Sequence, residues 1–153
     1  MAHARFVLKN ESIYDLEMFV QLGKNPFRRY LQRDVMGAGA RITINDHARL
    51  GLGILTENEE DMNQLKTRTE RLASYFHDDY EISEKMDFNL TVYYQPSLDS
   101  SEDFKASVIG ALDFKMNEKF KVTLQYNTFY DSRPHATAMK RDEGIATNFS
   151  YSF

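Results

Sequence analysis

Apolar and polar residues alternate along most of this chain of 153 residues. A period of two is typical of β-strands that present one apolar and one polar face. No segment has the wide apolar stripe of an amphipathic helix, although residues 58–71 allow a short polar one. The predicted fold class is all-β, an antiparallel up-and-down meander of about eight to ten strands. The segments with the strand pattern are residues 6–8, 16–22, 36–44, 50–54, 72–82, 88–94, 104–116, 120–126 and 145–153.

The length and the composition fit a single folded domain over residues 1–153. The absence of Cys excludes a disulfide scaffold, a thiolate zinc site and thiol catalysis. The net charge of −4 argues against a general nucleic-acid binder, which normally carries a basic excess. No apolar run reaches the roughly 18 residues of a membrane-spanning helix. A membrane-spanning β-strand needs only about 10 alternating residues, so the composition is compatible with a membrane barrel.

Short turns and longer polar loops alternate between the predicted strands. In an up-and-down meander, this order puts the long loops at one end of the strands and the tight turns at the other. The first residues lack the apolar stretch of a signal peptide, so the chain is either cytoplasmic or has had its targeting segment removed. The turns are residues 45–47, 83–85 and 117–119, and the long loops are residues 24–32, 56–65, 96–102 and 132–143.

Alternation alone does not say whether the apolar rows face a core or lipid. Aromatic residues stand near the ends of the rows, as at Phe104 and Phe114, with aliphatic residues between them. Two aromatic girdles around an aliphatic band are typical of membrane barrels, and the loop asymmetry also favours that interpretation. The alternative is a soluble barrel that binds a lipid or another apolar molecule. It would need an inward row of Leu90, Val92, Val108, Leu112, Val122 and Leu124.

The opposite rows carry charges of both signs, which would line the inside of a barrel. A lumen of about eight to ten strands is filled by side chains, and paired charges would fill it. His77 and Asp79 also fit a general base and its orienting acid, but Ser74 would face the other side of the strand. We therefore interpret the charges as structural and predict no catalytic residue, no metal site and no cofactor. The predicted lumen charge network is Arg71, His77, Asp79, Glu81, Lys105, Asp113 and Lys121.

Three smaller motifs have a structural interpretation. The acidic run 57–61 lacks the glycine and the ligand periodicity of a calcium loop, so we predict a solvated acidic loop. Lys24, Arg28 and Arg29 either contact lipopolysaccharide phosphates or are ordinary loop charges, and the second interpretation is the simpler one. Gly37 and Gly39 lie within a predicted strand with no helix after them, which indicates close packing or curvature.

Short motifs along the chain carry a family resemblance. They are Gly37-Ala38-Gly39-Ala40-Arg41, Val92-Tyr93-Tyr94-Gln95-Pro96, Tyr130-Asp131-Ser132-Arg133-Pro134, Lys140-Arg141-Asp142 and Asn148-Phe149-Ser150-Tyr151-Ser152-Phe153. Together they resemble the salt-induced outer-membrane protein family. The resemblance implies a barrel in the bacterial outer membrane whose molecular role is largely uncharacterised. It also implies outer-membrane lipid, lipopolysaccharide and the barrel-assembly machinery as partners. Phe149, Tyr151 and Phe153 would be the C-terminal assembly signal.

The strand count conflicts with this resemblance, because bacterial barrels have an even number of strands. Either the weak segment 6–8 is not a strand, or the chain lacks some N-terminal strands of a larger sheet, or it pairs with another chain. We expect a barrel or part of one with a structural, binding or transport-associated role and no enzymatic activity. The alternatives are the soluble barrel described above and an outer-membrane enzyme whose catalytic residues converge from distant positions.

Overall fold

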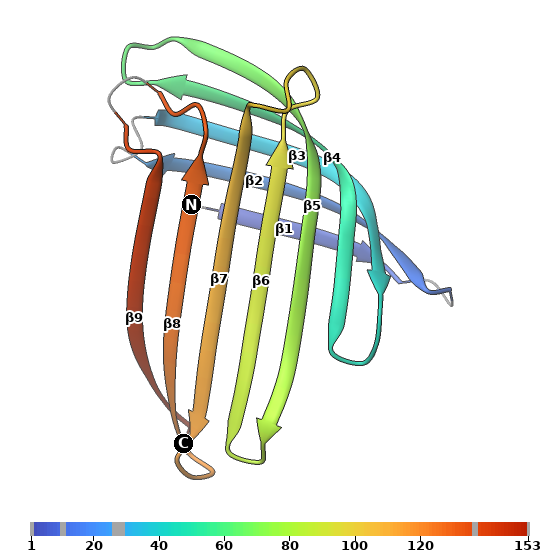
Figure 1. Ribbon diagram of the computed structural model, residues 1–153, viewed down its shortest axis with the longest axis vertical. Coiled ribbons are helices and arrows are strands. Elements are labelled where there is room, and N and C mark those ends of the chain that lie inside the picture. The colour runs from blue at the N-terminus through green and yellow to red at the C-terminus, as the bar shows by residue number, and fades with distance from the viewer. Residues whose placement is uncertain (1, 10–11, 26–29, 136–137, 153) are drawn as a thin grey trace.

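The structure of the chain is a computed structural model that describes residues 2–9, 12–25, 30–135 and 138–152. The described residues form one antiparallel sheet in which each strand pairs with the next one along the sequence (Figure 1). No helix that could cross a membrane is found in this part of the chain. The predicted all-β meander is therefore confirmed. The strands are β1 (Ala2–Leu8), β2 (Tyr14–Asn25), β3 (Tyr30–Thr43), β4 (Ala48–Asp61), β5 (Lys66–Ser83), β6 (Met86–Pro96), β7 (Phe104–Lys115), β8 (Phe120–Asp131) and β9 (Arg141–Tyr151).

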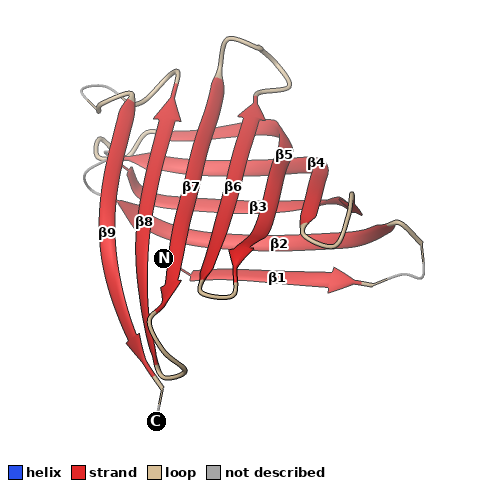
Figure 2. Ribbon diagram, turned by 60° about the horizontal axis from the view of Figure 1, so that its bottom comes forward, coloured by secondary structure: helices blue, strands red, loops and turns tan. Residues whose placement is uncertain are grey.

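The sheet is rolled but not closed. In Figures 1 and 2, β1 to β4 cross behind β6 to β9, and the long strand β5 curves from one group into the other. The strand order places β1 and β9 at opposite edges, with no ladder between them in the described residues. The nine strands thus form part of a barrel wall, with a concave face between the two groups and a convex face around them.

The alternation assigns one row of each strand to each face. Tyr75 on β5 donates a hydrogen bond to Glu17 on β2 over 3.0 Å, and Lys105 on β7 contacts Glu57 on β4 over 2.9 Å. These strands are not neighbours in the sheet, so the odd-numbered residues of β1 to β8 face the concave side. The start of β3 is an exception, because a register shift there pairs Tyr30 with Asp61. The even-numbered rows face outward, and many of their apolar side chains are exposed. Examples are Phe6, Leu16, Met18, Val20, Met36, Leu52, Ile54, Leu72, Tyr80, Tyr94 and Leu124.

The connections fall at two ends of the sheet, as expected for a meander. Residues 97–103 and 132–140 are long connections at one end, which we call the loop end. The other two predicted long loops are wrong, because only residues 26–29 and 62–65 separate the strands there. Residues 58–71 form no helix and belong mostly to β4 and β5. Both rows of β4 are polar beyond Thr56, so apolar and polar residues no longer alternate there. A prediction based on alternation therefore ends the strand too early.

Neighbouring strands are staggered by about one residue for each step across the sheet. The register partners can be followed across the sheet, one residue per strand. From Arg5 in the middle of β1 they lead through Phe19, Gly37 and Leu55 to Arg71 on β5. From Ala146 in the middle of β9 they lead through Gln125, Ala111 and Asn89 to Asp79 on β5. The two endpoints differ by eight positions along β5 over eight strand-to-strand steps. With a rise of about 3.3 Å and a strand spacing of about 4.8 Å, this stagger corresponds to a tilt of roughly 35°.

Gly39 and Gly53 bring β3 and β4 together at a point where no side chain fits. They are directly paired, and a Cβ on either residue would lie less than 3.0 Å from the backbone of the other strand. The predicted close packing in this glycine-rich segment is confirmed at Gly39. Gly110 on β7 differs, because a Cβ there would meet nothing within 4 Å.

We expect Gly53→Ala to lower the free energy of unfolding by about 1–3 kcal/mol, because the backbone of β3 must move to admit the methyl group. Gly110→Ala is the matched control and should be neutral or slightly stabilising, since alanine restricts the unfolded chain. Denaturant titration followed by circular dichroism measures both. Equal effects of the two substitutions would show that the β3–β4 approach is not tight.

Candidate functional site

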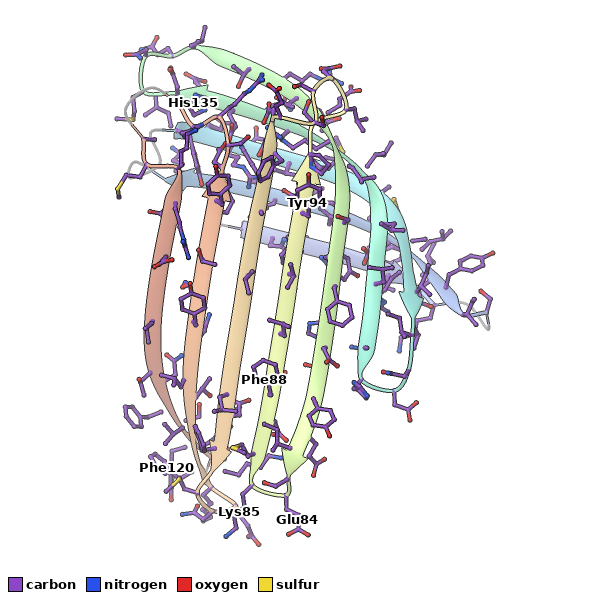
Figure 3. The ribbon with its side chains drawn as sticks, in the orientation of Figure 1. Glu84, Lys85, Phe88, Tyr94, Phe120 and His135 are labelled. Atoms are coloured by element: carbon purple, nitrogen blue, oxygen red, sulfur yellow. The ribbon has the colours of Figure 1, made fainter. Side chains whose placement is uncertain are left out.

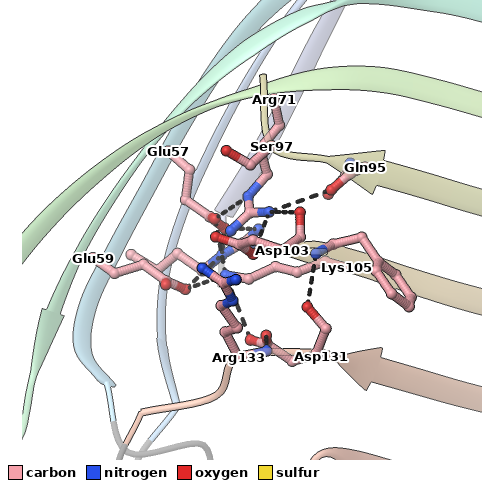
Figure 4. Close-up of polar contacts among 12 residues, drawn as sticks. Glu57, Glu59, Arg71, Gln95, Ser97, Asp103, Lys105, Asp131 and Arg133 are labelled. Atoms are coloured by element: carbon pink, nitrogen blue, oxygen red, sulfur yellow. Dashed lines mark hydrogen bonds and ion pairs between the residues drawn. The ribbon is translucent and has the colours of Figure 1, made fainter. Parts of the chain in front are cut away.

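Charged side chains converge on the concave face near the loop end (Figure 4). They come from five strands and from the two long connections, so the roll of the sheet gathers residues that are far apart in the sequence. We call this group the ion cluster. Its members are Arg33 on β3, Glu57 and Glu59 on β4, Arg71 on β5, Asp103 after β6, Lys105 on β7, Asp131 on β8 and His135 after β8.

Glu57 is the centre of the ion cluster and is only 2% exposed. Its Oε1 accepts a hydrogen bond of 2.6 Å from Arg33 Nε. Its Oε2 lies 2.9 Å from both Arg71 Nε and Lys105 Nζ. Three cations therefore surround one buried carboxylate. Such an arrangement offsets the high cost of removing the carboxylate charge from water.

A second set of contacts completes the pairing of the cations. Glu59 Oε1 lies 2.8 Å from Lys105 Nζ and 3.3 Å from Arg33 Nε. Arg71 Nη1 donates to Asp103 Oδ1 over 2.9 Å, and Lys105 Nζ lies 3.8 Å from Asp131 Oδ2. Each of these three cations thus contacts at least two carboxylates. Buried charges satisfied in this way fix one arrangement of the elements that carry them.

Two cavities lie on the concave face beside the ion cluster. One has a volume of about 530 Å³ and reaches the loop end, with Tyr30, Asp131 and His135 in its lining. The other has a volume of about 290 Å³ and lies deeper in the roll, between Glu17 and Tyr93. Arg33 and Lys105 line both cavities. Gln21, Ser107, Ile109 and Phe129 line both as well, so the two cavities adjoin beside the ion cluster.

The seven residues of the predicted lumen network do not form one group. Arg71 and Lys105 belong to the ion cluster, each about 3% exposed. The other five lie nearer the opposite end of the concave rows, which we call the turn end. There His77 Nε2 lies 2.8 Å from Asp79, Lys121 Nζ lies 3.3 Å from Asp113, and Glu81 is exposed.

The His77 pair has no nucleophile beside it on its own strand. His77 Nδ1 lies 2.9 Å from the Thr91 hydroxyl, so both of its ring nitrogens are engaged within the sheet. Ser74 belongs to the convex row and donates its hydroxyl hydrogen bond to the Tyr94 carbonyl over 2.6 Å. The described residues also contain no group of His, Asp and Glu side chains arranged to hold a metal ion.

The acidic run 57–61 is the main correction to the sequence-based site. It was predicted to be a solvated loop, but it is the end of β4, and Glu57 and Asp61 are buried. The signal was present in the sequence, because carboxylates at 57, 59 and 61 recur with the strand period of two. Only the structure shows that β4 continues to Asp61, and therefore that these carboxylates face the concave side. Arg33 was missed for the same reason, since it lies next to a segment interpreted as a loop.

Aromatic side chains lie at a loop-end level and a turn-end level of the convex face, and Figure 3 labels Tyr94 near the first and Phe120 near the second. At the loop end, the ring centroid of Phe104 lies 5.6 Å from that of Tyr94 and 5.4 Å from that of Tyr130. At the turn end, Phe120 and Phe149 stack at 6.2 Å. Phe104 and Phe114 on β7 are ten residues apart, which is about 33 Å along a strand. Between the two levels the convex rows form a mainly aliphatic band, with Phe76 and Tyr126 as aromatic exceptions.

The remaining predicted residues lie at the two ends of the sheet. Lys24 is exposed near the end of β2, whereas Arg28 and Arg29 lie outside the described residues. Phe149 and Tyr151 are 70% and 57% exposed on the convex row of β9. Phe153 lies outside the described residues.

The chain belongs to the family described as "Protein of unknown function, DUF481", whose model matches residues 3–153. No curated protein and no solved structure matches the chain. The family description assigns no molecular role, so the functional argument depends on the geometry of the two faces.

We expect Glu57→Gln to destabilise the protein by about 3 kcal/mol or more, because three buried cations lose their shared negative charge. Glu102→Gln is the matched control. Glu102 pairs with Arg133 at 3.2 Å but is 85% exposed, so its substitution should change the unfolding midpoint little. Denaturant titration of both variants measures the difference. A small effect at Glu57 would show that the ion cluster contributes little to stability.

Proposed function

We propose that this member of the DUF481 family forms the wall of a β-barrel in the bacterial outer membrane. Its role would be structural or connected with the binding or transport of a solute, and it would not be enzymatic. The observation that carries the proposal is the inverted polarity of the two faces. Charged residues are buried on the concave face, while large apolar residues are exposed on the convex face.

The inversion is large at the level of single residues. Lys105 and Arg71 are each 3% exposed, whereas Met36, Ile54 and Ile145 are 66%, 61% and 76% exposed. In water, each fully exposed side chain of this size forgoes about 1.5–3 kcal/mol of burial free energy. Lipid removes this penalty for the convex face, because the apolar rows then contact acyl chains. A lumen lined with paired charges is also the usual interior of a membrane barrel.

The dimensions of the convex face support the same proposal. The aromatic levels on β7 lie about 33 Å apart along the strand, or roughly 27 Å along an axis tilted by 35°. Outer-membrane barrels have an apolar band about 25 Å tall between two aromatic girdles, with strands tilted by about 35–45°. The convex face also has an apolar depression of about 740 Å³ beside Met18, Met36 and Ile54, which would accommodate acyl chains.

The geometry does not favour the soluble alternative. That function requires an inward apolar row on β6, β7 and β8. Leu90 pairs with Gly110, and Gly110 pairs with Tyr126, in the convex rows. The neighbouring concave row contains Thr91, Ile109 and Asn127. The residues proposed to hold an apolar ligand thus lie outside the roll. They are Leu90, Val92, Val108, Leu112, Val122 and Leu124.

The bacterial outer-membrane location, the assembly signal and the lipopolysaccharide contact are inferred from the sequence. The resemblance to the salt-induced outer-membrane protein family supports a bacterial outer-membrane location. Phe149 and Tyr151 present aromatic side chains on the convex row, as an assembly signal with Phe153 would require. Lys24, with Arg28 and Arg29, would contact lipopolysaccharide phosphates at the loop end. The ion cluster would restrict the lumen, so any solute would bind at the loop end or be small.

We expect the full-length protein to refold only when a mild detergent is present, because the convex rows need an apolar environment. Far-UV circular dichroism should then report β-structure, and the unheated protein should migrate differently from the heated protein on a gel. A monodisperse, β-rich protein in plain buffer would contradict the membrane proposal.

A pair of substitutions on β8 compares the two faces directly. Leu124 is 45% exposed on the convex row, near the middle of the aliphatic band. Leu124→Arg should cost about 2–4 kcal/mol in lipid vesicles, because the charge enters the hydrocarbon region. Gln125→Arg is the control and should cost much less, since Gln125 faces the concave side between Ala111 and Ala146. A convex face in contact with water would tolerate Leu124→Arg without loss of stability.

A further inference from the structure

Both edges of the sheet are able to pair with further strands. β9 spans Arg141–Tyr151, and its last ten residues contain no Pro and no Lys. Its outward side chains Ile145 and Phe149 are 76% and 70% exposed. Proteins with permanently open sheets usually protect such edges with Pro, Lys, bulges or short strands. The charged residues of β9 are confined to its start at 141–143, and residues 144–151 have none of this protection, so an unpaired edge there would promote aggregation.

The directions of the two edges restrict what can close the sheet. Every neighbouring pair from β1 to β9 is antiparallel, so β1 and β9 run in the same direction. A direct β9–β1 ladder would therefore be parallel. Closure with antiparallel ladders at both joints requires an odd number of additional strands. The total is then even, which is the rule for bacterial outer-membrane barrels.

We propose that β1 and β9 are both paired, antiparallel, with an odd number of amphipathic strands supplied from outside residues 2–152 of this chain. This inference rests on the proposed membrane barrel. The outward rows of these strands would be apolar, to continue the lipid-facing surface. A second copy of the chain does not meet the requirement, because a copy with the same membrane orientation would join both edges in parallel.

The inward rows of the two edges indicate the chemistry of the added strands. After Asp142, the inward row of β9 consists of small residues, namely Gly144, Ala146, Asn148 and Ser150. This leaves room for larger polar side chains on the strand that pairs with β9. The inward row of β1 carries His3 and Arg5, with Arg5 3.8 Å from Glu17. The strand that pairs with β1 should therefore present inward carboxylates.

Photo-crosslinking from the edges tests the proposal. Residues 1–153 contain no Cys, so a single Cys in this region carries a maleimide-linked benzophenone. The label is placed at Thr147→Cys on β9 and at Ala4→Cys on β1, both in convex rows. Leu112→Cys on β7 is the matched control, because β6 and β8 occupy both of its sides. The protein is isolated from membranes in mild detergent and irradiated, and the crosslinked peptides are identified by mass spectrometry.

We expect both edge labels to reach residues outside 2–152 and the control to reach only β6 and β8. Moving the label from Thr147 to Tyr151→Cys should shift the crosslinked residue towards the N-terminus of the partner strand, as antiparallel pairing requires. The proposal is overturned by crosslinks from β9 to β1, by crosslinks between differently tagged copies of residues 2–152, by a parallel shift at the β9 joint, or by edge labels that reach lipid alone.

The test separates this inference from the proposed function. If the protein needs detergent to fold but the edge crosslinks fail, the membrane barrel stands and only the odd-strand closure is wrong. If the protein folds in plain buffer, the membrane proposal is wrong, and crosslinks at the edges would then report pairing in a soluble assembly.

Discussion

The contacts of Glu57 hold together parts of the sheet that backbone hydrogen bonds do not join. The ladders connect each strand only to its neighbours, so they permit a flat sheet as well as a rolled one. Lys105 on β7 reaches Glu57 on β4 and thereby fixes the roll. The apolar core of the described residues is small by comparison, consisting of Val35, Leu55 and Ala73 with Phe19 beside them. Polar contacts across the concave face therefore hold the strands in their rolled arrangement, a role that a hydrophobic core has in most proteins. They are specific, because a buried charge tolerates few alternative partners.

The sequence predicted the fold well where only one row of a strand is polar. From β6 to β9, aliphatic and aromatic residues alternate with charged or small ones, and all four strands were found. The ends of β6 and β7 are correct within two residues, whereas β8 ends five residues later and β9 begins four residues earlier than predicted. The prediction failed where both rows become polar. Beyond Thr56 the outward row of β4 continues with Asn58 and Glu60, while Glu57 and Glu59 face inward. No period of two in hydrophobicity remains there, and the segment was interpreted as a loop or a short helix.

The same limit explains what was missed at the site. Sequence alone identified Arg71 and Lys105 as inward charges, because the rows around them alternate clearly. It did not identify Glu57, since a dense run of carboxylates normally indicates a solvated segment. The partners also lie far apart in sequence, since Glu59 and Lys105 are 46 positions apart. Their meeting depends on how the sheet rolls, and this depends on strand stagger and on close approaches such as the one between Gly39 and Gly53.

The position of the ion cluster relative to the convex rows has a consequence for the proposed role. Met36 pairs with Thr56 and Asp34 pairs with Asn58, so the convex surface changes from apolar to polar over these positions of β3 and β4. Glu57 lies at this same level on the concave side. In the proposed orientation, the ion cluster would then stand at the loop-end boundary of the lipid band. A solute entering from the loop end would reach the 530 Å³ cavity first and would meet Lys105 and Arg33, which line both cavities, before the deeper one. Breaking buried ion pairs is costly, so this geometry favours binding at the loop end over free diffusion through a wide pore.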